Sequence, residues 1–263
     1  MLTLTTLASG SSGNCTLVSD GHTHLLIDAG ISARRITNAL KALDIDPKEL
    51  AGVLVTHEHS DHISGLATLT KQLSFPLYAS SGTARALCAK LTALDENRVH
   101  SFTPGASFEI GALAVETFPT PHDAAQSTGY ALSCGGRKAA IVTDLGHVTP
   151  EVEEGIKGAH LLVAETNHDP EWLRSGSYPY FLKERILGSE GHLSNQDGAR
   201  LICSAAAQGA KTVVLAHLSK DNNTPQRAYD TVAMALMRQG AELERDVVLA
   251  VAPRAEMGCS YRV

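Results

Sequence analysis

The 263-residue sequence lacks long hydrophobic runs and any excess of positive charge. No stretch approaches the roughly 18 consecutive apolar residues of a transmembrane helix, so we expect no membrane partner. Residues 1–7 also lack the basic and apolar segments of a secretory signal peptide. Lys and Arg number 22 against 28 Asp and Glu, a formal net charge of −6, which argues against coating nucleic acid by charge alone. A nuclease whose metal ions supply positive charge locally stays possible.

Cysteine is sparse, and the usual nucleotide and serine-hydrolase motifs are missing. The five cysteines are scattered and form no C-x-x-C pair. We therefore expect reduced thiols, mostly in the core of a cytoplasmic protein. No P-loop or G-x-G-x-x-G occurs in a suitable context, and no G-x-S-x-G supports a catalytic serine.

Short β-rich runs alternate with helical patterns, without long linkers or internal repeats. Strands are expected at 3–7, 16–19, 24–28, 52–56, 76–79, 99–102, 107–110, 113–118, 128–133, 138–142, 161–165, 212–216 and 247–251. Helices are expected at 32–43, 61–73, 83–94, 195–208 and 225–239. This order, repeated in two halves, predicts a mixed α/β protein with two sheets covered by helices. We expect residues 1–263 to form one domain.

The strongest chemical signal is His57-Glu58-His59-Ser60-Asp61-His62, directly after the apolar run Gly-Val-Leu-Val-Thr. Imidazole and carboxylate are ligands of divalent metals. In an extended turn His57 and His59 point to one side, as alternate residues do. Asp61 is expected to cap the following helix. Together with His62 it can then face a second metal position. Three histidines and an aspartate within six residues are too many for a polar loop with incidental histidines. The pairs His57/His59 and Asp61/His62, both from one turn, suit two metal ions.

Four further apolar strands each end in one residue of a ligand type: Asp28, His122, Asp144 and His217. A single histidine after a strand is usually structural. However, ligand sites in α/β proteins gather at the carboxyl ends of strands. The repetition therefore predicts that these residues join the His57–His62 segment in one site.

His-Glu-His-Ser-Asp-His, with Asp-Ala-Gly upstream and single His, Asp and His residues downstream, resembles the metallo-β-lactamase superfamily, whose five motifs all occur here in order. The resemblance implies a four-layer αββα sandwich with the site at the sheet edges. It implies that Asp28 orients ligand histidines without binding metal. The implied ligands are His57, His59 and His122 for one metal and Asp61, His62 and His217 for the second, with Asp144 bridging both.

Four shorter runs resemble a narrower group within that superfamily. They are Ser-Gly-Ser-Ser-Gly-Asn at 9–14, Glu-Thr-Asn-His-Asp at 165–169, Tyr-Pro-Tyr at 178–180 and Gly-His-Leu-Ser-Asn at 191–195. These runs are similar to the YycJ (WalJ) group, single-domain proteins regarded as DNA exonucleases. Thr166 stands where that group leads us to expect Ser, a conservative difference.

Two divalent ions, Zn, Mn or Fe, can share a water and lower its pKa, which suits hydrolysis of a phosphodiester. The metal-bridging hydroxide would attack phosphorus, and Asp61 would also orient it. His192 would assist the leaving group, as a general acid or by binding a non-bridging oxygen. Further candidate substrate contacts are Ser11, Ser12 and Asn14 in a loop that resembles an anion nest, together with Asn167, His168, Lys183 and Arg185.

Several functions remain open at this point. The first is a 5′-to-3′ DNA exonuclease, with nucleic acid as its partner. The others are a small-ester hydrolase (a glyoxalase-II-type thioesterase or a lactonase), a diiron redox protein and a non-catalytic scaffold. Only 72 residues separate Asp144 from His217. That is too few for the large clamp domain that is inserted in β-CASP nucleases. A short arm could lie within residues 172–189. Oligomeric state and metal identity stay open.

Overall fold

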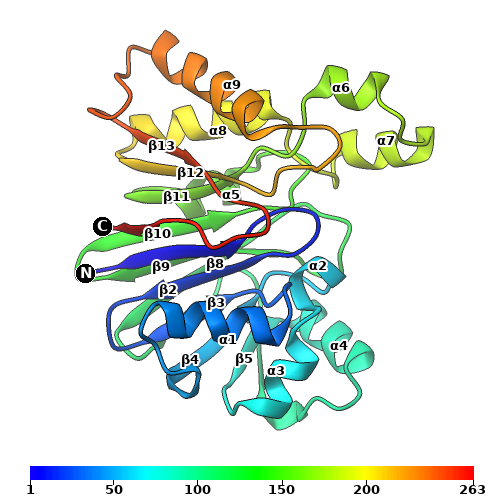
Figure 1. The fold of residues 1–263 in the computed structure, drawn as a ribbon, viewed down its shortest axis with the longest axis vertical. Coiled ribbons are helices and arrows are strands. Elements are labelled where there is room, and N and C mark those ends of the chain that lie inside the picture. The colour runs from blue at the N-terminus through cyan, green and yellow to red at the C-terminus, as the bar shows by residue number, and fades with distance from the viewer.

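The computed structural model describes all residues, Met1–Val263. Two seven-stranded sheets pack face to face, and helices cover both outer faces (Figure 1). The strand order is β14-β1-β2-β3-β4-β5-β6 in the first sheet and β13-β12-β11-β10-β9-β8-β7 in the second. This arrangement confirms the predicted αββα sandwich. No helix combines the length and apolar character needed to cross a bilayer.

The first sheet contains β1 (Thr3–Ala8), β2 (Cys15–Ser19), β3 (His24–Ile27), β4 (Leu50–Val55), β5 (Leu77–Ser80), β6 (Val99–Phe102) and β14 (Ser260–Arg262). The second contains β7 (Ser107–Ile110), β8 (Leu113–Pro119), β9 (Thr128–Cys134), β10 (Arg137–Val142), β11 (Leu161–Glu165), β12 (Thr212–Ala216) and β13 (Val248–Val251).

The helices are α1 (Ala33–Ala42), α2 (Ser60–Ile63), α3 (Leu66–Gln72), α4 (Ser81–Lys90), α5 (Pro150–Ile156), α6 (Pro170–Ser175), α7 (Tyr180–Leu187), α8 (Asn195–Ala207) and α9 (Pro225–Arg238). Two 3₁₀ turns, Pro47–Glu49 and Glu96–Arg98, precede β4 and β6. The helices α1, α3 and α4 flank the first sheet, and α5, α8 and α9 flank the second (Figure 1).

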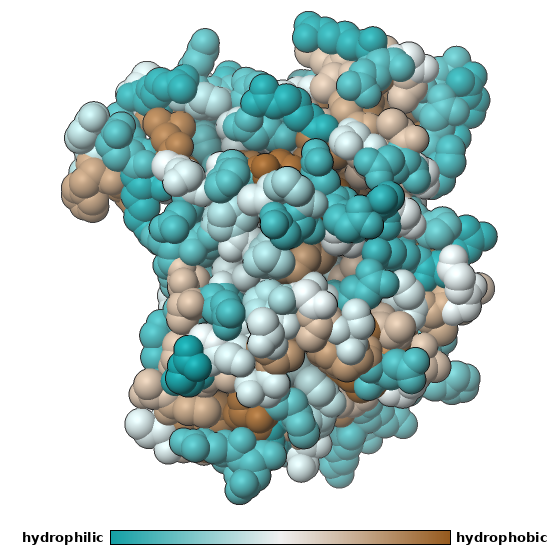
Figure 2. Space-filling view, turned by 180° about the vertical axis from the view of Figure 1, so that it is seen from behind, coloured by the Kyte–Doolittle hydropathy of each residue, from teal (hydrophilic) through white to brown (hydrophobic).

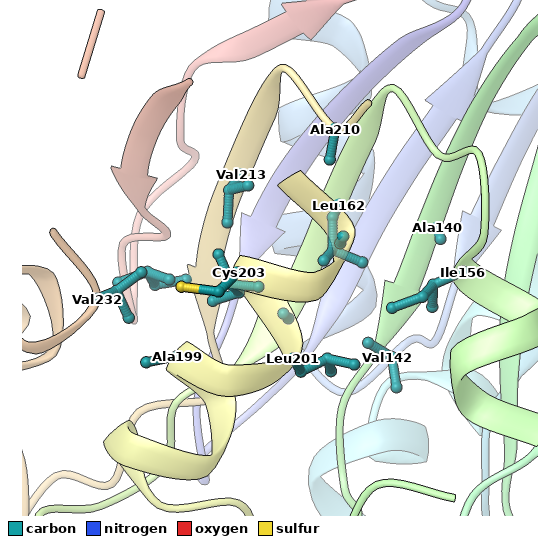
Figure 3. Close-up of a cluster of buried hydrophobic side chains, with 14 of the residues drawn as sticks. Ala140, Val142, Ile156, Leu162, Ala199, Leu201, Cys203, Ala210, Val213 and Val232 are labelled. Carbon is teal, nitrogen blue, oxygen red and sulfur yellow. The ribbon is translucent and has the colours of Figure 1, made fainter. Parts of the chain in front are cut away.

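The apolar strands are buried on both faces, which explains their nearly continuous hydrophobic runs. In β11, Leu161 and Val163 join the core between the sheets, whereas Leu162 and Ala164 face the helices. This alternation follows from the two-residue period of a strand. Figure 3 shows the outer core, where α8 packs over β11 and β12 with Cys203 beside Leu162 and Val213.

Two helix predictions were wrong in detail. The helix expected at 61–73 begins at Ser60 and is broken at Gly65, so that α2 and α3 are separate. A Cβ atom on Gly65 would lie 2.0 Å from the carbonyl oxygen of Ile31, so this break lets the chain pass close to another segment. Asp61 is therefore not a helix cap, and its carboxylate is free to face the site. The helix expected at 83–94 is α4, which Ser80 caps and which ends at Lys90.

Candidate metal centre

The predicted ligand residues come together where loops leave strands of both sheets, and two of them, Asp61 and His62, lie in α2. Their ligand atoms form four groups, each with all atoms within 4.8 Å of one another. The groups are His57/His59/His122, Asp61/His62/His217, His57/His62/Asp144 and Asp144/Glu165/His192/His217. Two of the groups are the two triads that the superfamily resemblance implies.

Asp144 lies between the two triads. Its Oδ2 atom is 3.4 Å from Nε2 of His62, and its Oδ1 atom is 3.8 Å from Nε2 of His122 and 3.5 Å from Nε2 of His217. The side chain is only 2% exposed. One buried carboxylate thus contacts histidines of both triads, which is the position that a bridging ligand requires.

Two buried ligand atoms in this cluster have no hydrogen-bond partner in the protein. They are Nε2 of His57 and Oδ2 of Asp144. A buried polar atom without a partner costs free energy. A divalent ion contacted by both atoms would remove that cost, so the residues present fit a metal site.

The buried histidines differ in the charge that their surroundings favour. Burial lowers the pKa of His217, but the charge of Asp144 and hydrogen bonds with Asp61 and Glu165 outweigh it and raise that pKa to about 10. The pKa of His62 is likewise raised, because Asp144 and Asp28 outweigh its burial. Burial and the charge of His62 hold the pKa of His57 well below its usual value. Without metal, protons on His62 and His217 thus balance the carboxylates.

Asp28 holds the ring of His62 in place. Its Oδ2 atom lies 2.7 Å from Nδ1 of His62, and its Oδ1 atom accepts a 2.8 Å hydrogen bond from the backbone N–H of Thr56. Burial raises the pKa of Asp28, against the charge of His62. The opposite ring nitrogen, Nε2, then faces Asp61 and Asp144. A carboxylate on the outer side of a ligand histidine fixes the orientation of the ring.

Glu165 is the residue that the sequence analysis missed. It ends β11 and is fully buried. Its Oε1 atom lies 2.8 Å from Nδ1 of His217 and 2.9 Å from Nδ1 of His192, and Oε2 accepts a 3.0 Å bond from Leu193 N–H. The signal was present in the sequence, because Glu165 is an acidic residue at the end of an apolar strand. Asp28 and Asp144 were found by that same pattern.

His192 lies over the cluster and is partly open to solvent. Its side chain is 16% exposed, whereas the side chain of Glu165 is fully buried. Its ring centroid is 5.1 Å from that of His122 and 5.3 Å from that of His217. With Nδ1 engaged by Glu165, Nε2 is the ring nitrogen left for a substrate.

Three residues of the site have a left-handed backbone: Asp28 (φ 63°), Asp144 (φ 59°) and His217 (φ 56°). Non-glycine residues rarely adopt this conformation, and it concentrates at functional sites. Hydrogen bonds hold the turn at His217, whose N–H donates to Oγ of Ser9 at 2.9 Å and whose carbonyl accepts from Nδ2 of Asn167 at 2.8 Å. Asn167 therefore supports a ligand loop.

Some of the other candidate substrate contacts are already hydrogen-bonded within the protein, and others are exposed to solvent. Asn14 lies 3.1 Å from Nε2 of His62 and 3.3 Å from Oδ2 of Asp61, so it faces the ligand residues. Lys183 donates to the carbonyl oxygens of Arg174 and Gly176, and Arg185 pairs with Asp123. Ser11 and Ser12 are exposed. His168 is buried, with neither ring nitrogen hydrogen-bonded, and burial lowers its pKa to about 4.

The class of this protein is defined by a two-sheet sandwich with two neighbouring triads at one edge, one of three histidines and one of two histidines and an aspartate. The chain belongs to the beta-lactamase superfamily: the family model described as "Beta-lactamase superfamily domain" matches residues 23–218. It is 38% identical over 234 residues to exodeoxyribonuclease YycJ of Bacillus anthracis, covering 89% of each chain. It is 38% identical over 232 residues to exodeoxyribonuclease WalJ of Streptococcus pneumoniae, covering 88% of this chain and 86% of that one.

A solved structure gives the same fold. The metallo-beta-lactamase fold protein YhfI from Bacillus subtilis superposes over 100% of both chains with a TM-score of 0.75, at 16% sequence identity. At that identity the comparison bears on the fold alone.

Proposed function

We propose that this chain is a metal-dependent exodeoxyribonuclease that removes nucleotides from the 5′ end of DNA, acting as one domain in the cytoplasm. The observation that carries the proposal is a complete set of ligand residues in a chain 38% identical to two exodeoxyribonucleases over most of its length. That likeness also favours DNA over the small esters and thioesters on which proteins with similar ligand sets could act.

In this proposal His57, His59 and His122 hold one ion, Asp61, His62 and His217 hold the second, and Asp144 bridges them. Two divalent ions bound there, Zn, Mn or Fe, would lower the pKa of a shared water and neutralise the charge of a phosphodiester. Asp61 is the most open of these carboxylates, with 22% side-chain exposure against 2% for Asp144. Its carboxylate is therefore the one placed to accept a hydrogen bond from a water and orient it.

His192 and Glu165 act together on the leaving group. With Nδ1 donating to Glu165, Nε2 of His192 can carry a proton toward the departing oxygen or bind a non-bridging oxygen. Glu165 fixes the ring and leaves only one nitrogen for the substrate. Glu165 is thus a positioning residue for both His192 and His217.

The loop between β1 and β2 is the proposed receptor of the terminal phosphate. Its side chains Ser11 and Ser12 are exposed, and Asn14 at its end contacts Asp61. The hydroxyl groups of Ser11 and Ser12 can donate to a phosphate, whereas the backbone N–H groups of Gly10, Gly13 and Asn14 already donate within the protein. Because this loop adjoins the second triad, a 5′ phosphate held there would leave the first phosphodiester near the metal ions.

Linear and closed-circular single-stranded DNA of one sequence test the proposal. Metal-loaded protein should release mononucleotides from the linear form and leave the circle intact. Chelation with EDTA should abolish release, and readdition of Mn²⁺ or Zn²⁺ should restore it. Cleavage of the circle would contradict the exonuclease proposal. Hydrolysis of S-lactoylglutathione without any action on DNA would replace it with a thioesterase.

A further inference from the structure

Few buried polar side-chain atoms outside the proposed metal ligands lack a hydrogen-bond partner. They belong to Thr6, Glu58, Thr166, His168 and Arg254. Glu58 is the only carboxylate in this set, and it lies between His57 and His59 in the ligand segment (residues 57–62). On the face shown in Figure 2, by contrast, apolar residues (brown) are scattered among hydrophilic ones (teal). The most distinct feature that the ligand set leaves unexplained is therefore the side chain of Glu58.

The carboxylate of Glu58 joins the ligand segment to the loop that carries His122. This His122 loop (residues 120–127) connects β8 to β9. Oε1 of Glu58 accepts a 2.9 Å hydrogen bond from the backbone N–H of Ala125, three residues after His122. The residue is only 8% exposed, and its carbonyl oxygen accepts a 2.9 Å bond from Nζ of Lys90. Both the side chain and the backbone of Glu58 are thus held in place.

The first triad takes its ligands from both of these segments. His57 and His59 belong to the ligand segment, whereas His122 belongs to the His122 loop. Nε2 of His122 lies 3.3 Å from Nδ1 of His59, and Nδ1 of His122 donates to the carbonyl oxygen of Gly191 at 3.1 Å. Gly191 therefore orients the ring of His122. The distance between the two segments depends on the contacts that join them, and the bond from Ala125 to Glu58 is one of these.

The next residue of the loop, Gln126, is held by α4 instead. Its Oε1 atom accepts a 2.8 Å hydrogen bond from the backbone N–H of Gly82. Its carbonyl oxygen accepts hydrogen bonds from the hydroxyl groups of Ser80 and Thr83. The side chains of Glu58 and Gln126 thus hold neighbouring residues of one loop, but only Glu58 ties the loop to the ligand segment.

We propose that Glu58 is a positioning residue for the first metal, the one assigned to His57, His59 and His122. Its hydrogen bond with Ala125 sets the distance between His122 and the other two histidines. This role rests on the proposed function and its ligand sets, and it needs the reach of an oxygen acceptor, not a negative charge. Residues that support metal ligands typically change metal affinity about 10- to 100-fold.

Two substitutions separate reach from charge. Glu58→Gln keeps the length of the side chain and an oxygen for the N–H of Ala125, and its NH₂ group would take the position of Oε2, which has no hydrogen-bond partner. Glu58→Asp keeps the charge, but it is one methylene shorter and falls short of that N–H. Gln126→Ala is the matched control, because it removes the bond to Gly82 and leaves the two hydroxyl bonds to the carbonyl oxygen of residue 126.

Titration of metal-free protein with Zn²⁺ against a competing chelator would follow the two binding steps. His59→Ala, which removes a ligand of the first triad, identifies the step that belongs to the first metal. We expect Glu58→Asp to raise the Kd of that step about tenfold or more and to leave the other step within about threefold. Glu58→Gln and Gln126→Ala should stay within about threefold of wild type at both steps. A general loss of stability would instead weaken both steps alike.

Three results would overturn this role. Glu58→Asp could bind both metals as the wild-type protein does, Glu58→Gln could lose the first metal as Glu58→Asp does, or Gln126→Ala could weaken that step equally. Failure of the proposed function looks different. Wild-type protein that loads two metal ions and degrades no DNA would contradict the exonuclease, while the comparison of the Glu58 variants would still stand.

Discussion

At the scale of single residues, the site depends on buried carboxylates that each contact two or more histidines. Asp144 contacts histidines of both triads, and Glu165 contacts both His192 and His217. Burial alone would raise the pKa of Glu165, but the charge of His192 and its hydrogen bonds to both histidines hold that pKa well below the usual value. Glu165 therefore stays ionised and can orient both rings.

Replacing Glu165 by Gln should lower activity and metal affinity together. The amide keeps the size of the side chain but removes the charge. Its NH₂ group would face donors in either orientation: the two Nδ1–H groups at the Oε1 position, or the backbone N–H groups of Leu145 and Leu193 at the Oε2 position. We expect losses of about 10- to 100-fold, the usual range for a residue behind a ligand histidine. Steady-state kinetics and a competitive metal titration would measure them, with Glu109→Gln on the exposed face of β7 as the control. Unchanged metal affinity would show that Glu165 does not position His217.

Metal binding should release protons from the protein. The pKa of His217 in the metal-free protein is about 10, because Asp144, Asp61 and Glu165 outweigh the effect of burial, so the ring is protonated at pH 7. A histidine must lose its proton to bind a metal. Metal affinity should therefore rise with pH up to about 10. Adding Zn²⁺ to metal-free protein in weakly buffered indicator dye would detect the release, and the absence of any pH change would contradict this charge state.

At the scale of elements, the loops that leave the strands need close backbone contacts. Gly30, which follows β3, donates to the carbonyl oxygen of Asn14, and Asn14 donates to that of Asp61, each at 2.7 Å. A Cβ atom on Gly30 would lie 1.7 Å from the backbone oxygen of Asp61. The glycine of the Asp-Ala-Gly motif thus lets three separate loops meet behind the second triad.

The substitution Gly30→Ala should displace Asp61 and weaken binding of the second metal. The displaced atom belongs to the backbone, so no side-chain rotation can relieve the clash. Gly158→Ala is the matched control, since that position has φ +70° and no atom within 4 Å of the added carbon. The control should lose about 1 kcal/mol of stability and keep its metals. Metal content after gel filtration would separate the two variants, and a fully loaded Gly30→Ala protein would contradict the packing argument.

The sequence was sufficient to predict most strands and which His and Asp side chains lie together, but not how the loops bend. Runs such as Leu161–Glu165 are buried on both faces and are apolar throughout, so they stand out. The left-handed turns at Asp28, Asp144 and His217 depend on tertiary hydrogen bonds and leave no local pattern. The helices α6 and α7 are short, with 6 and 8 residues, and their aromatic side chains point to solvent. They therefore lack the apolar periodicity that marks a core helix.

At the scale of the whole molecule, both sheets contribute to one site. Asp28 and His57 follow strands of the first sheet. In the second sheet Glu165 ends β11, and Asp144 and His217 follow β10 and β12. Their relative positions therefore depend on how the sheets pack. Tyr130 in β9 is fully buried between the sheets and donates a 2.7 Å hydrogen bond to the carbonyl oxygen of Val55 in β4, two residues before His57.

Removing that hydroxyl should destabilise the fold without changing the ligands. We expect Tyr130→Phe to lower the free energy of unfolding by about 1–2 kcal/mol, because the ring still fills its space but one buried hydrogen bond is lost. Tyr78→Phe, which removes a hydroxyl from a half-buried ring, is the control and should change little. Urea unfolding would measure both variants. Equal stability of the two would show that the bond between the sheets contributes nothing.

The most direct test of the whole account is a degradation ladder. Wild-type protein and Asp144→Asn, a change that suits the left-handed backbone, would be loaded with Mn²⁺ or Zn²⁺ and given 5′-phosphorylated, 3′-labelled DNA, both single- and double-stranded. The account predicts progressive shortening from the 5′ end by the wild-type protein and none by Asp144→Asn. Intact DNA after incubation with wild-type protein that is confirmed to carry two metal ions would contradict it.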